Sequence, residues 1–324
     1  MNDHATVERS PDPGREVFLQ AVLGGLSERP RSIPARFLYD SRGSALFDTI
    51  CAQPEYYLTR TETGILEARA AEIAGLAGPG CALVEFGSGS STKSRLLIEA
   101  MDLAVYVPID ISRLHLDQTA AQLRLDYPEL RVQPVAANFM KVEALPADID
   151  DAIRRVGFFP GSTIGNLTPE ESDAFLRRAR RLVGADGAML IGIDLRKDPT
   201  LLTAAYNDAA GVTARFTLNL LRRANRELGA DFDPGAWQHE AFYNARLGRM
   251  EIYIRSLRGQ TVSVAGRSFA FQPDERIHTE YSYKYDPHEF AESAHRAGFR
   301  LAELWTDPAE LFAVVWLEAG PAPR

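Results

Sequence analysis

Apolar residues near the N-terminus recur at helical spacing. Over residues 16–28 this spacing predicts an amphipathic helix. A short helix is expected over 44–52, and a longer one over 61–75 with Thr61 as its cap. The aromatic-rich stretch 30–57 has no long period, which indicates a loop packed over another part of the protein.

From residue 81 onward, short apolar runs alternate with helical stretches. Strands are expected in the segments CALVEFG, AVYVPIDI, RVQPVAANF, RVGFFPGSTIGN and AMLIGIDL. Helices are expected between them, with Ser112 capping one and Pro169 in the first turn of another. Strands that alternate with helices predict a mostly parallel sheet that is covered on both faces.

The pattern changes again after this region. Residues 199–228 look helical with a break near Gly211, and the next stretches alternate polar and apolar residues. Turn signals at 247–248 and 265–266 predict antiparallel strands of a second sheet. A helix over 287–297 and two strands end the chain. We therefore expect an α/β fold interrupted by an α+β excursion, with the last strands rejoining the first sheet.

Composition excludes several classes of function. Thirty-six Lys and Arg against 44 Asp and Glu give a net charge of −8, which argues against a nucleic-acid partner. No apolar run approaches the ~20 residues of a membrane span, and the polar segment 1–14 lacks the pattern of a signal peptide. The two cysteines are far apart and the six histidines form no ligand pattern, so no metal is expected. We expect a cytoplasmic monomer that acts on a small molecule.

The segment LVEFGSGSST places a glycine loop between a strand and a helix. Glycine permits a positive φ and a close approach of the backbone to a ligand, although the same loop can be only a tight connection. The third glycine of a dinucleotide motif is absent, since Thr92 follows Gly87 and Gly89. Asp110 ends the next strand, where a carboxylate can accept both ribose hydroxyls. A ribose without a diphosphate cradle fits S-adenosylmethionine better than a nicotinamide dinucleotide. Lys93 does not convert the loop into a P-loop, because the Gly-Lys-Ser/Thr register is missing.

A third polar position follows the next predicted strand, in the segment AANFM. In methyltransferases this strand end usually carries a polar side chain for the adenine amino group and then an apolar residue over the ring. Asn138 and Phe139 suit these two roles. Asn138 also suits a helix N-cap or a turn, and the two interpretations are compatible.

Three further segments carry a resemblance to one family. They are LYDSRGSALFD (38–48), PEYYLTRTE (54–62) and GSTIGNLTP (161–169). In this order and spacing they resemble the histidine Nα-methyltransferases, which make hercynine in ergothioneine biosynthesis. The resemblance runs from about Phe18 to Leu317. It implies a Rossmann-like class I methyltransferase domain over 61–196 and 287–324, and an α+β substrate-binding domain over 1–60 and 197–286.

The resemblance also implies a binding site for S-adenosylmethionine. The methyl-donor glycine of the family falls on Gly87, its loop lysine on Lys93 and its ribose aspartate on Asp110. The adenine pair, usually Asp-Phe, is Asn138-Phe139 here, which keeps an acceptor oxygen and removes a charge. Phe47 matches an aromatic position near the cofactor.

For the substrate L-histidine, the resemblance implies three kinds of contact. Asn166 and Tyr206 match the grip on the carboxylate, while Tyr39 and Tyr56 match aromatic positions near the amine. Tyr39, Tyr56 and Asn166 are thereby the candidate catalytic residues. The imidazole-contacting pair is found as Glu280-Tyr281-Ser282, and Ile252 stands where the family usually has methionine.

Each of these positions also has an ordinary structural interpretation. Tyr56, Phe47 and Tyr206 suit a hydrophobic core, Asn166 suits a left-handed turn, and Glu280 with Ser282 suit a solvated strand face. Three other functions are weighed against histidine methylation. Methylation of another aromatic amino acid is favoured only by Ile252, and a non-catalytic binding module would not need to keep the substrate residues together. A nicotinamide oxidoreductase would need the missing third glycine.

Overall fold

The computed structural model describes residues 13–89, 92–147, 149 and 154–320. The polar N-terminal segment, apart from its last two residues, and Ser90 and Ser91 of the glycine loop lie outside these residues. The described chain divides into two compact units. The smaller unit comprises the chain up to Ala52, Tyr206–Phe242 and Glu251–Glu280, and the larger comprises Gln53–Ala205, Tyr243–Met250 and the chain from Tyr281 onward.

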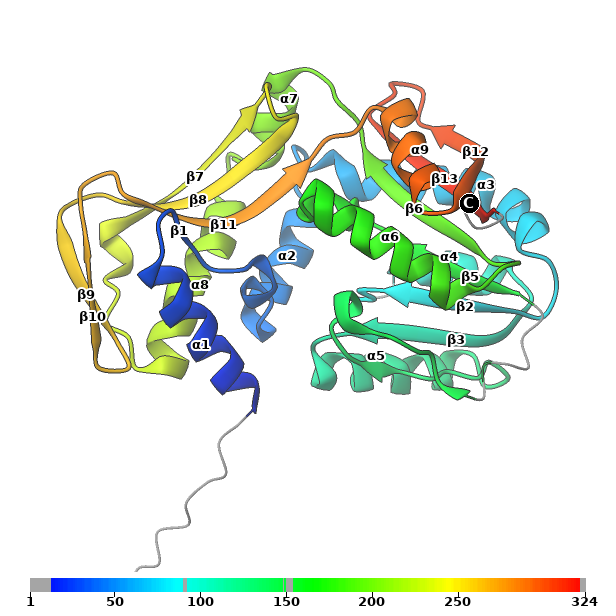
Figure 1. Ribbon diagram of the computed structural model, residues 1–324, viewed down its shortest axis with the longest axis horizontal. Coiled ribbons are helices and arrows are strands. Elements are labelled where there is room, and N and C mark those ends of the chain that lie inside the picture. Colours follow the sequence, from blue (N-terminus) through cyan, green and yellow to red (C-terminus); the bar gives the residue numbers. More distant parts are fainter. Residues whose placement is uncertain (1–12, 90–91, 148, 150–153, 321–324) are drawn as a thin grey trace, which may run out of the picture. The chain divides into compact units, whose positions relative to one another are not determined.

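The larger unit is built on a seven-stranded sheet in the order β12-β13-β6-β5-β2-β3-β4 (Figure 1). Its strands are β2 Cys81–Phe86, β3 Leu103–Asp110, β4 Val135–Ala136, β5 Arg155–Phe159, β6 Ala188–Asp194, β12 Phe299–Thr306 and β13 Phe312–Ala319. The pairs from β6 to β4 are all parallel, and β13 is antiparallel to both of its neighbours. This confirms the α/β class and the return of the last strands to the first sheet.

The third predicted strand is much shorter than expected. Of residues 131–139, only Val135 and Ala136 form a strand, and Val132 makes an isolated bridge to Tyr106. Pro134 lies between these two points of pairing and has no N–H to donate, so the ladder is interrupted there.

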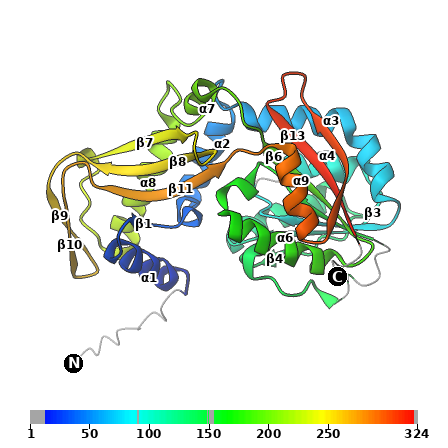
Figure 2. The ribbon, with the colours of Figure 1, turned by 45° about the horizontal axis from the view of Figure 1, so that its top comes forward.

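Helices cover both faces of this sheet. On one face α6 (Pro169–Val183) packs beside α9 (Pro287–Arg296), and on the other α3 (Tyr57–Ala77) packs beside α4 (Thr92–Ala100), as Figures 1 and 2 show. The unit also contains α5 (Arg113–Asp126) and α7 (Pro199–Ala205). A capping box of Thr168 and Glu171 begins α6 one residue before its proline.

Two predicted helix caps differ in the structure. Helix α3 begins at Tyr57, four residues before the expected start, so Thr61 is not its cap. The reason is local: the Tyr56 N–H donates to Gln53 O in a turn over Pro54, and the helix follows this turn directly. Ser112 occupies the N-cap of α5 as predicted, but its side chain makes no capping hydrogen bond.

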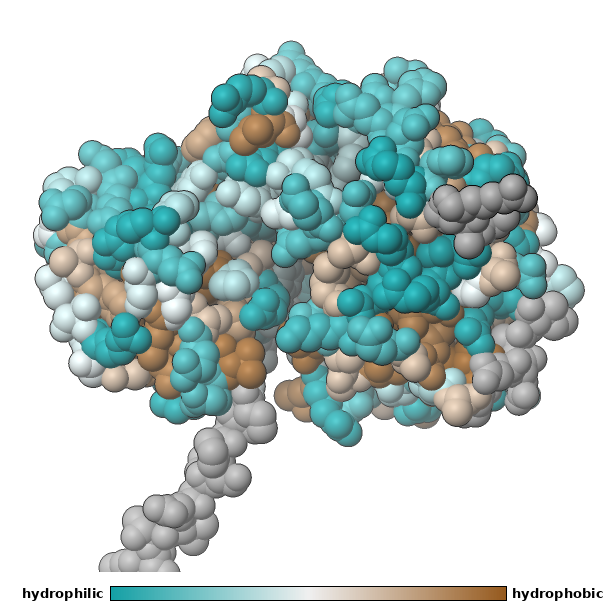
Figure 3. Space-filling model, viewed as in Figure 1, coloured by the Kyte–Doolittle hydropathy of each residue, from teal (hydrophilic) through white to brown (hydrophobic). Residues whose placement is uncertain are grey.

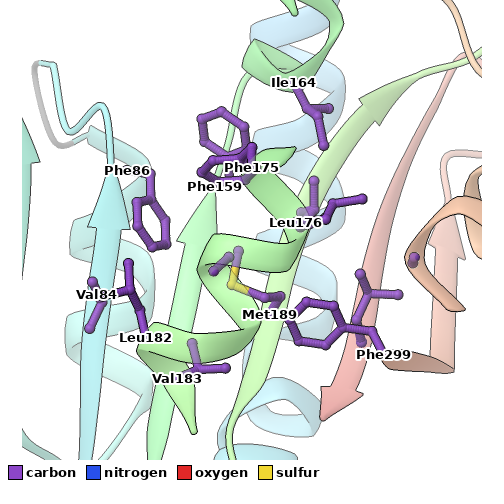
Figure 4. Close-up of a cluster of buried hydrophobic side chains, with 14 of the residues drawn as sticks. Val84, Phe86, Phe159, Ile164, Phe175, Leu176, Leu182, Val183, Met189 and Phe299 are labelled. Carbon is purple, nitrogen blue, oxygen red and sulfur yellow. The ribbon is translucent and has the colours of Figure 1, made fainter. Parts of the chain in front are cut away.

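The hydrophobic core of the larger unit lies between the sheet and helices α6 and α9. Figure 4 shows Val84 and Phe86 of β2, Phe159 of β5 and Met189 of β6 directed toward the helix face. The rings of Phe159 and Phe175 have centroids 4.3 Å apart. At ~1.5–3 kcal/mol for each large apolar side chain removed from water, this cluster is a principal source of stability for the unit.

The smaller unit contains α1 (Pro13–Ser27), α2 (Ser41–Cys51) and α8 (Val212–Leu228). A four-stranded sheet in the order β1-β11-β8-β7 accompanies them, formed by β1 Arg31–Ser32, β7 Trp237–Asn244, β8 Arg249–Ser256 and β11 Arg276–Tyr283. The expected single second sheet is therefore wrong in one respect. Strands β9 (Gln260–Val264) and β10 (Arg267–Phe271) form a separate two-stranded antiparallel hairpin.

The boundaries of the two units differ from the domains expected from the sequence. The larger unit includes residues 53–60, 197–205, 243–250 and 281–286, which the sequence places in the substrate-binding domain. Strands β7, β8 and β11 each carry residues of both units. A substrate-binding role for the smaller unit stays a prediction.

The face of the molecule drawn in Figure 3 mixes hydrophilic and hydrophobic residues, with hydrophilic ones more frequent. Among the described residues, large exposed hydrophobic side chains include Leu114 and Ile111 near the end of β3. No helix in the described part of the chain is both long enough and apolar enough to cross a membrane.

Candidate active site

The glycine turn after β2 adopts the backbone conformation that the sequence predicts. Gly87 and Gly89 have φ of +79° and +46°, in the left-handed region that favours glycine. The Gly87 N–H donates to Ile109 O at 2.8 Å, which ties the turn to the end of β3. A Cβ on Gly87 would lie 4.0 Å from Cε1 of Phe139, so the Phe139 ring faces this turn.

Asp110 lies at the end of β3, and its carboxylate reaches the same turn. Its Oδ2 accepts from Gly89 N at 3.3 Å, and its Oδ1 accepts from Ser112 N at 2.8 Å. His115, which no sequence motif points to, adds a contact between its Nε2 and Gly89 O at 3.0 Å. A carboxylate, a glycine turn and an aromatic ring at one edge of the sheet suit the ribose and base of a nucleoside, so these residues fit S-adenosylmethionine.

Asn138 is used by the backbone in this structure. Its Oδ1 accepts from Met140 N at 2.9 Å and caps the short 3-10 helix Phe139–Lys141. The turn interpretation is therefore confirmed, and the adenine role stays a prediction beside it.

Asp110→Ala is expected to weaken binding of S-adenosylhomocysteine by about tenfold to a hundredfold. A hydrogen bond to a charged acceptor contributes ~1.5–3 kcal/mol, and every 1.4 kcal/mol is tenfold in affinity. Titration calorimetry measures the effect, with Asp117→Ala on the exposed face of α5 as the matched control. Unchanged affinity in Asp110→Ala would show that Asp110 does not bind the cofactor.

Glu85 is a fully buried acid one residue before the end of β2. Its Oε2 accepts from Ser94 Oγ of α4 at 2.5 Å and from the Tyr106 hydroxyl of β3. Burial raises the pKa of the Glu85 carboxyl to about 7, against the opposing effect of these two hydrogen bonds. Glu85 belongs to the segment LVEFGSGSST, whose local pattern predicts no role for it.

The raised pKa of Glu85 predicts a pH-dependent stability. Between pH ~4.5 and 7 the unfolded chain ionises this carboxyl while the folded protein keeps it protonated, so the contribution of Glu85 to stability falls as pH rises through this window. Glu85→Gln keeps an acceptor for Ser94 and Tyr106 without the charge. Relative to wild type, the variant should gain up to about 3 kcal/mol between pH 4.5 and 7.5 in urea unfolding. A difference that is constant across this range would contradict the assignment.

Glu62, at the end of the segment PEYYLTRTE, contacts residues from the glycine-loop region and from the segment GSTIGNLTP. This side chain on α3 is 0% exposed, and its two oxygens accept from Gly161 N at 2.9 Å each. Its Oε2 also forms an ion pair with Lys93 Nζ at the start of α4. A Cβ on Gly192 of β6 would lie 2.0 Å from Glu62 Oε1, so glycine is needed there for the carboxylate to fit. Lys93, expected as a cofactor residue, thus has a buried carboxylate partner, and its contact with a cofactor stays a prediction.

The loop 161–166 is shaped by backbone contacts. Gly161 and Ser162 have positive φ of 74° and 55°, whereas Asn166 does not, so the left-handed-turn interpretation of Asn166 is wrong. Asn166 instead ends a short 3-10 helix, Thr163–Asn166, and is half-buried. A Cβ on Gly165 would approach Tyr283 O to 2.8 Å, so this glycine permits close packing against the backbone.

A second buried polar cluster surrounds Asp194, at the end of β6. The Tyr57 hydroxyl lies 2.8 Å from Asp194 Oδ1, and Lys284 Nζ lies 2.7 Å from Oδ2. Lys197 Nζ contacts the same carboxylate and donates to the Tyr57 hydroxyl at 2.7 Å. Burial lowers the pKa of Lys197 to about 8, although Asp194 opposes the shift. The Asp194 N–H donates to Ser162 Oγ at 2.9 Å, which links this cluster to the 161–166 loop.

Strand β11 carries the predicted imidazole-contacting residues on one face. Ser282 is 3% exposed, so the solvated-face interpretation is wrong for it, while Glu280 is half-buried. Lys284 Nζ donates to Ser282 Oγ at 2.8 Å. Tyr281 lies on the opposite face of the strand, under the Arg249 guanidinium, whose carbon is 3.6 Å from the ring centroid. The structure therefore separates Tyr281 from its two neighbours.

In the smaller unit, Tyr39 and Phe47 meet in one aromatic group. Their ring centroids are 5.5 Å apart, and Phe216 of α8 lies 5.3 Å from Tyr39. Asp40 fixes this segment, because its Oδ1 caps α2 at Gly43 N and accepts from Asn219 Nδ2, both at 2.7 Å.

The remaining predicted residues are largely buried. Tyr206 is 8% exposed in the smaller unit, where its carbonyl lies 2.9 Å from His239 Nε2, and Tyr56 is 8% exposed in the larger unit at the N-cap of α3. Ile252 on β8 is 2% exposed, and its carbonyl accepts from Thr279 Oγ1 at 3.1 Å. In the described part of the chain no group of three or more His, Cys, Asp and Glu residues could hold a metal ion.

The geometry of the larger unit defines a class of protein. A sheet of this order, with a glycine turn after its central strand and a carboxylate after the adjacent one, is that of a Rossmann-like, S-adenosylmethionine-dependent methyltransferase domain. The chain belongs to the SAM-dependent, histidine-specific methyltransferase family, whose sequence profile matches residues 18–319.

Two relatives of similar length agree with this assignment. A histidine N-alpha-methyltransferase of Mycolicibacterium smegmatis is 40% identical over 94% of this chain and 95% of its own, and one of Mycobacterium tuberculosis is 38% identical over the same shares. The ergothioneine biosynthesis protein 1 of Neurospora crassa is 33% identical over 86% of this chain and 32% of its own length. Among solved structures, the CcbJ methyltransferase of Streptomyces caelestis is 16% identical, covers 79% of this chain and 89% of its own, and has a TM-score of 0.46.

Proposed function

We propose that this enzyme transfers three methyl groups in succession from S-adenosylmethionine to the α-amino group of L-histidine. The product is hercynine, the trimethylammonium betaine, which serves ergothioneine biosynthesis. The observation that carries the proposal is the 40% identity, over 94% of the chain, to a relative named histidine N-alpha-methyltransferase. The relative named for ergothioneine biosynthesis supports the pathway.

The reaction does not require a strong general base from the protein. Methyl transfer from a sulfonium to an amine is an in-line displacement that needs a neutral amine and alignment, and orientation can supply ~7–11 kcal/mol of the barrier reduction. Asn166 and Tyr206 hold the substrate carboxylate in this proposal. Tyr39, Tyr56 and Asn166 direct the amine toward the methyl group that the cofactor supplies when it is bound.

Successive methylation needs a site that tolerates a growing cation. Thr163 is small and half-buried, and its hydroxyl donates a hydrogen bond to Pro160 O at 2.7 Å. Aromatic rings such as those of Tyr39 and Phe47 favour a trimethylammonium group through cation–π attraction. Glycine at 165 is explained by packing on Tyr283 instead of by room for methyl groups.

Specificity for histidine rests on β11. Glu280 accepts an N–H of the imidazole in this proposal, and Ser282, on the same strand face, meets the other ring nitrogen. Ile252 favours a second candidate, methylation of another aromatic amino acid, since it stands where the family usually has methionine.

Mass spectrometry separates these candidates. The purified protein is incubated with S-adenosylmethionine and each of the 20 amino acids in turn, and the masses of the products are measured. Histidine should gain up to three methyl groups. Methylation of another aromatic amino acid in preference to histidine would replace the first candidate by the second, and accumulation of a mono- or dimethyl product alone would contradict the three-step reaction.

A further inference from the structure

Lys284 has no role in the function proposed above, yet it is one of the most completely buried charged side chains in the described chain, with 0% of its side chain exposed. It follows β11 directly and shares the strand face of Ser282 and Glu280. Its ammonium lies between Asp194 Oδ2 at 2.7 Å and Ser282 Oγ at 2.8 Å. Burial of an ammonium is costly unless it is paired and hydrogen-bonded, so these contacts hold it in one place.

The anchor of Lys284 is itself rigid. Asp194 is 0% exposed, and its carboxylate is also contacted by the Tyr57 hydroxyl and by Lys197. Its backbone N–H is bound by Ser162. The position of the Lys284 ammonium is therefore fixed by three elements of the larger unit: α3, the end of β6 and the 161–166 loop.

An ammonium has three donors and no acceptor, so Lys284 donates to Ser282 and uses a lone pair of its oxygen. The hydroxyl hydrogen of Ser282 then points away from Lys284. An oxygen that accepts from a cation also becomes a stronger donor, because hydrogen bonds in a chain polarise one another. Lys284 thus prepares Ser282 to donate a hydrogen bond.

The charge of Lys284 opposes the effect of Glu280 on a bound imidazole. A carboxylate beside the ring favours the imidazolium, in which both nitrogens carry protons. The Ser282 hydroxyl, polarised by the Lys284 ammonium, donates a hydrogen bond. It therefore favours an imidazole in which the nitrogen facing Ser282 carries no proton.

We propose that Lys284 is a specificity-determining positioning residue that acts through Ser282. It makes the enzyme bind histidine with a neutral imidazole, whose one proton lies on the nitrogen that faces Glu280. This inference rests on the proposed function, since it takes histidine as the substrate and β11 as the strand that meets its ring.

The test is nitrogen NMR of ring-15N L-histidine bound to the enzyme with S-adenosylhomocysteine at pH 6.0. Free histidine is mostly imidazolium at this pH, because the ring pKa is ~6.5. Wild-type enzyme should show one protonated and one bare ring nitrogen. Two protonated nitrogens in the wild-type complex would overturn the proposal.

The variants identify the residue responsible. Lys284→Met leaves Asp194 paired with Lys197 and Tyr57, and it should return the bound ring to imidazolium at pH 6.0 and weaken histidine binding at pH 7.5 about threefold to tenfold. A purely structural role would weaken binding but leave the neutral ring, which would contradict the proposal. If Lys284→Met does not fold, Ser282→Ala replaces it. This variant should raise the imidazolium fraction at pH 6.0, and an unchanged spectrum would contradict the proposal.

Comparing wild type with the variants also accounts for the other ionisable groups, because these groups are the same in every protein measured. Those near Lys284 include Asp194, Lys197 and Tyr57, and Asp307 acts on Lys197 at longer range. Glu85, with its pKa near 7, is present in every variant and cancels in the comparison. Failure of the proposed function has a different result: wild-type enzyme would neither bind nor methylate histidine at pH 7.5.

Discussion

Glu280→Ala is expected to lower kcat/KM for L-histidine by roughly 10²-fold or more. A site built to hydrogen-bond a substrate N–H rejects analogues that lack it by up to ~10⁴–10⁵, so loss of the acceptor should remove much of that discrimination. The variant should also raise the relative activity on tryptophan or phenylalanine, since it removes a charge and shortens the side chain that faces the ring in the proposed site. Steady-state kinetics on the three amino acids, in wild type and variant, measure both effects.

Two companion variants sharpen this experiment. Glu280→Gln keeps an acceptor oxygen and should fall between wild type and Glu280→Ala. Glu292→Ala removes a carboxylate from the exposed part of α9 and should behave as wild type. If Glu280→Ala retains the full preference for histidine, the imidazole does not meet β11, and both the substrate assignment and the proposed role of Lys284 lose their physical basis.

The second large effect is expected at Glu62. Glu62→Ala leaves Lys93 without its buried carboxylate and Gly161 N without an acceptor. Removing one partner of a buried ion pair costs ~3–5 kcal/mol, and Lys93 is nearly buried at 15% exposure. Urea unfolding should therefore show a loss of about 3 kcal/mol. Binding of S-adenosylhomocysteine should weaken as well, because Lys93 lies at the start of the helix that follows the glycine loop.

A double variant distinguishes the ion pair from the packing of α3. Glu62→Ala with Lys93→Met removes both charges and should regain part of the lost stability, because no buried charge is left unpaired. Glu67→Ala, on the exposed side of the same helix, should stay within about 0.5 kcal/mol of wild type. If the double variant is as unstable as the sum of its single variants, Glu62 and Lys93 are not coupled.

Local patterns of the sequence were sufficient for most of the fold. The alternation of strands and helices from Cys81 to Asp194, and the return of the last two strands to the sheet, follow from periodicity and turn residues alone. The predictions were wrong where a single proline changed the local backbone. Pro134 interrupted the third strand, and the turn over Pro54 began α3 earlier than Thr61.

The candidate site was predictable to the extent that its chemistry is local. Gly87, Gly89 and Asp110 belong to a strand–turn–helix pattern that dictates its own backbone, and the structure places all three together. The alternation along β11 likewise places Glu280 and Ser282 on one face, although it gave no sign that Tyr281 would pack against Arg249.

The partners of the buried charges, in contrast, depend on the tertiary fold. Glu62 meets Lys93 from 31 residues away and Gly161 from 99 residues away. Asp194 binds Tyr57, 137 residues away in the sequence, and also pairs with Lys284. Lys284 in turn donates a hydrogen bond to Ser282. Local sequence patterns were enough to predict the parallel sheet and the glycine turn, because backbone conformation and hydrophobic period depend on near neighbours. The pairing of buried charges depends on which distant segments the fold brings within about 3 Å, since a hydrogen bond forms only at that distance, and no local pattern encodes it.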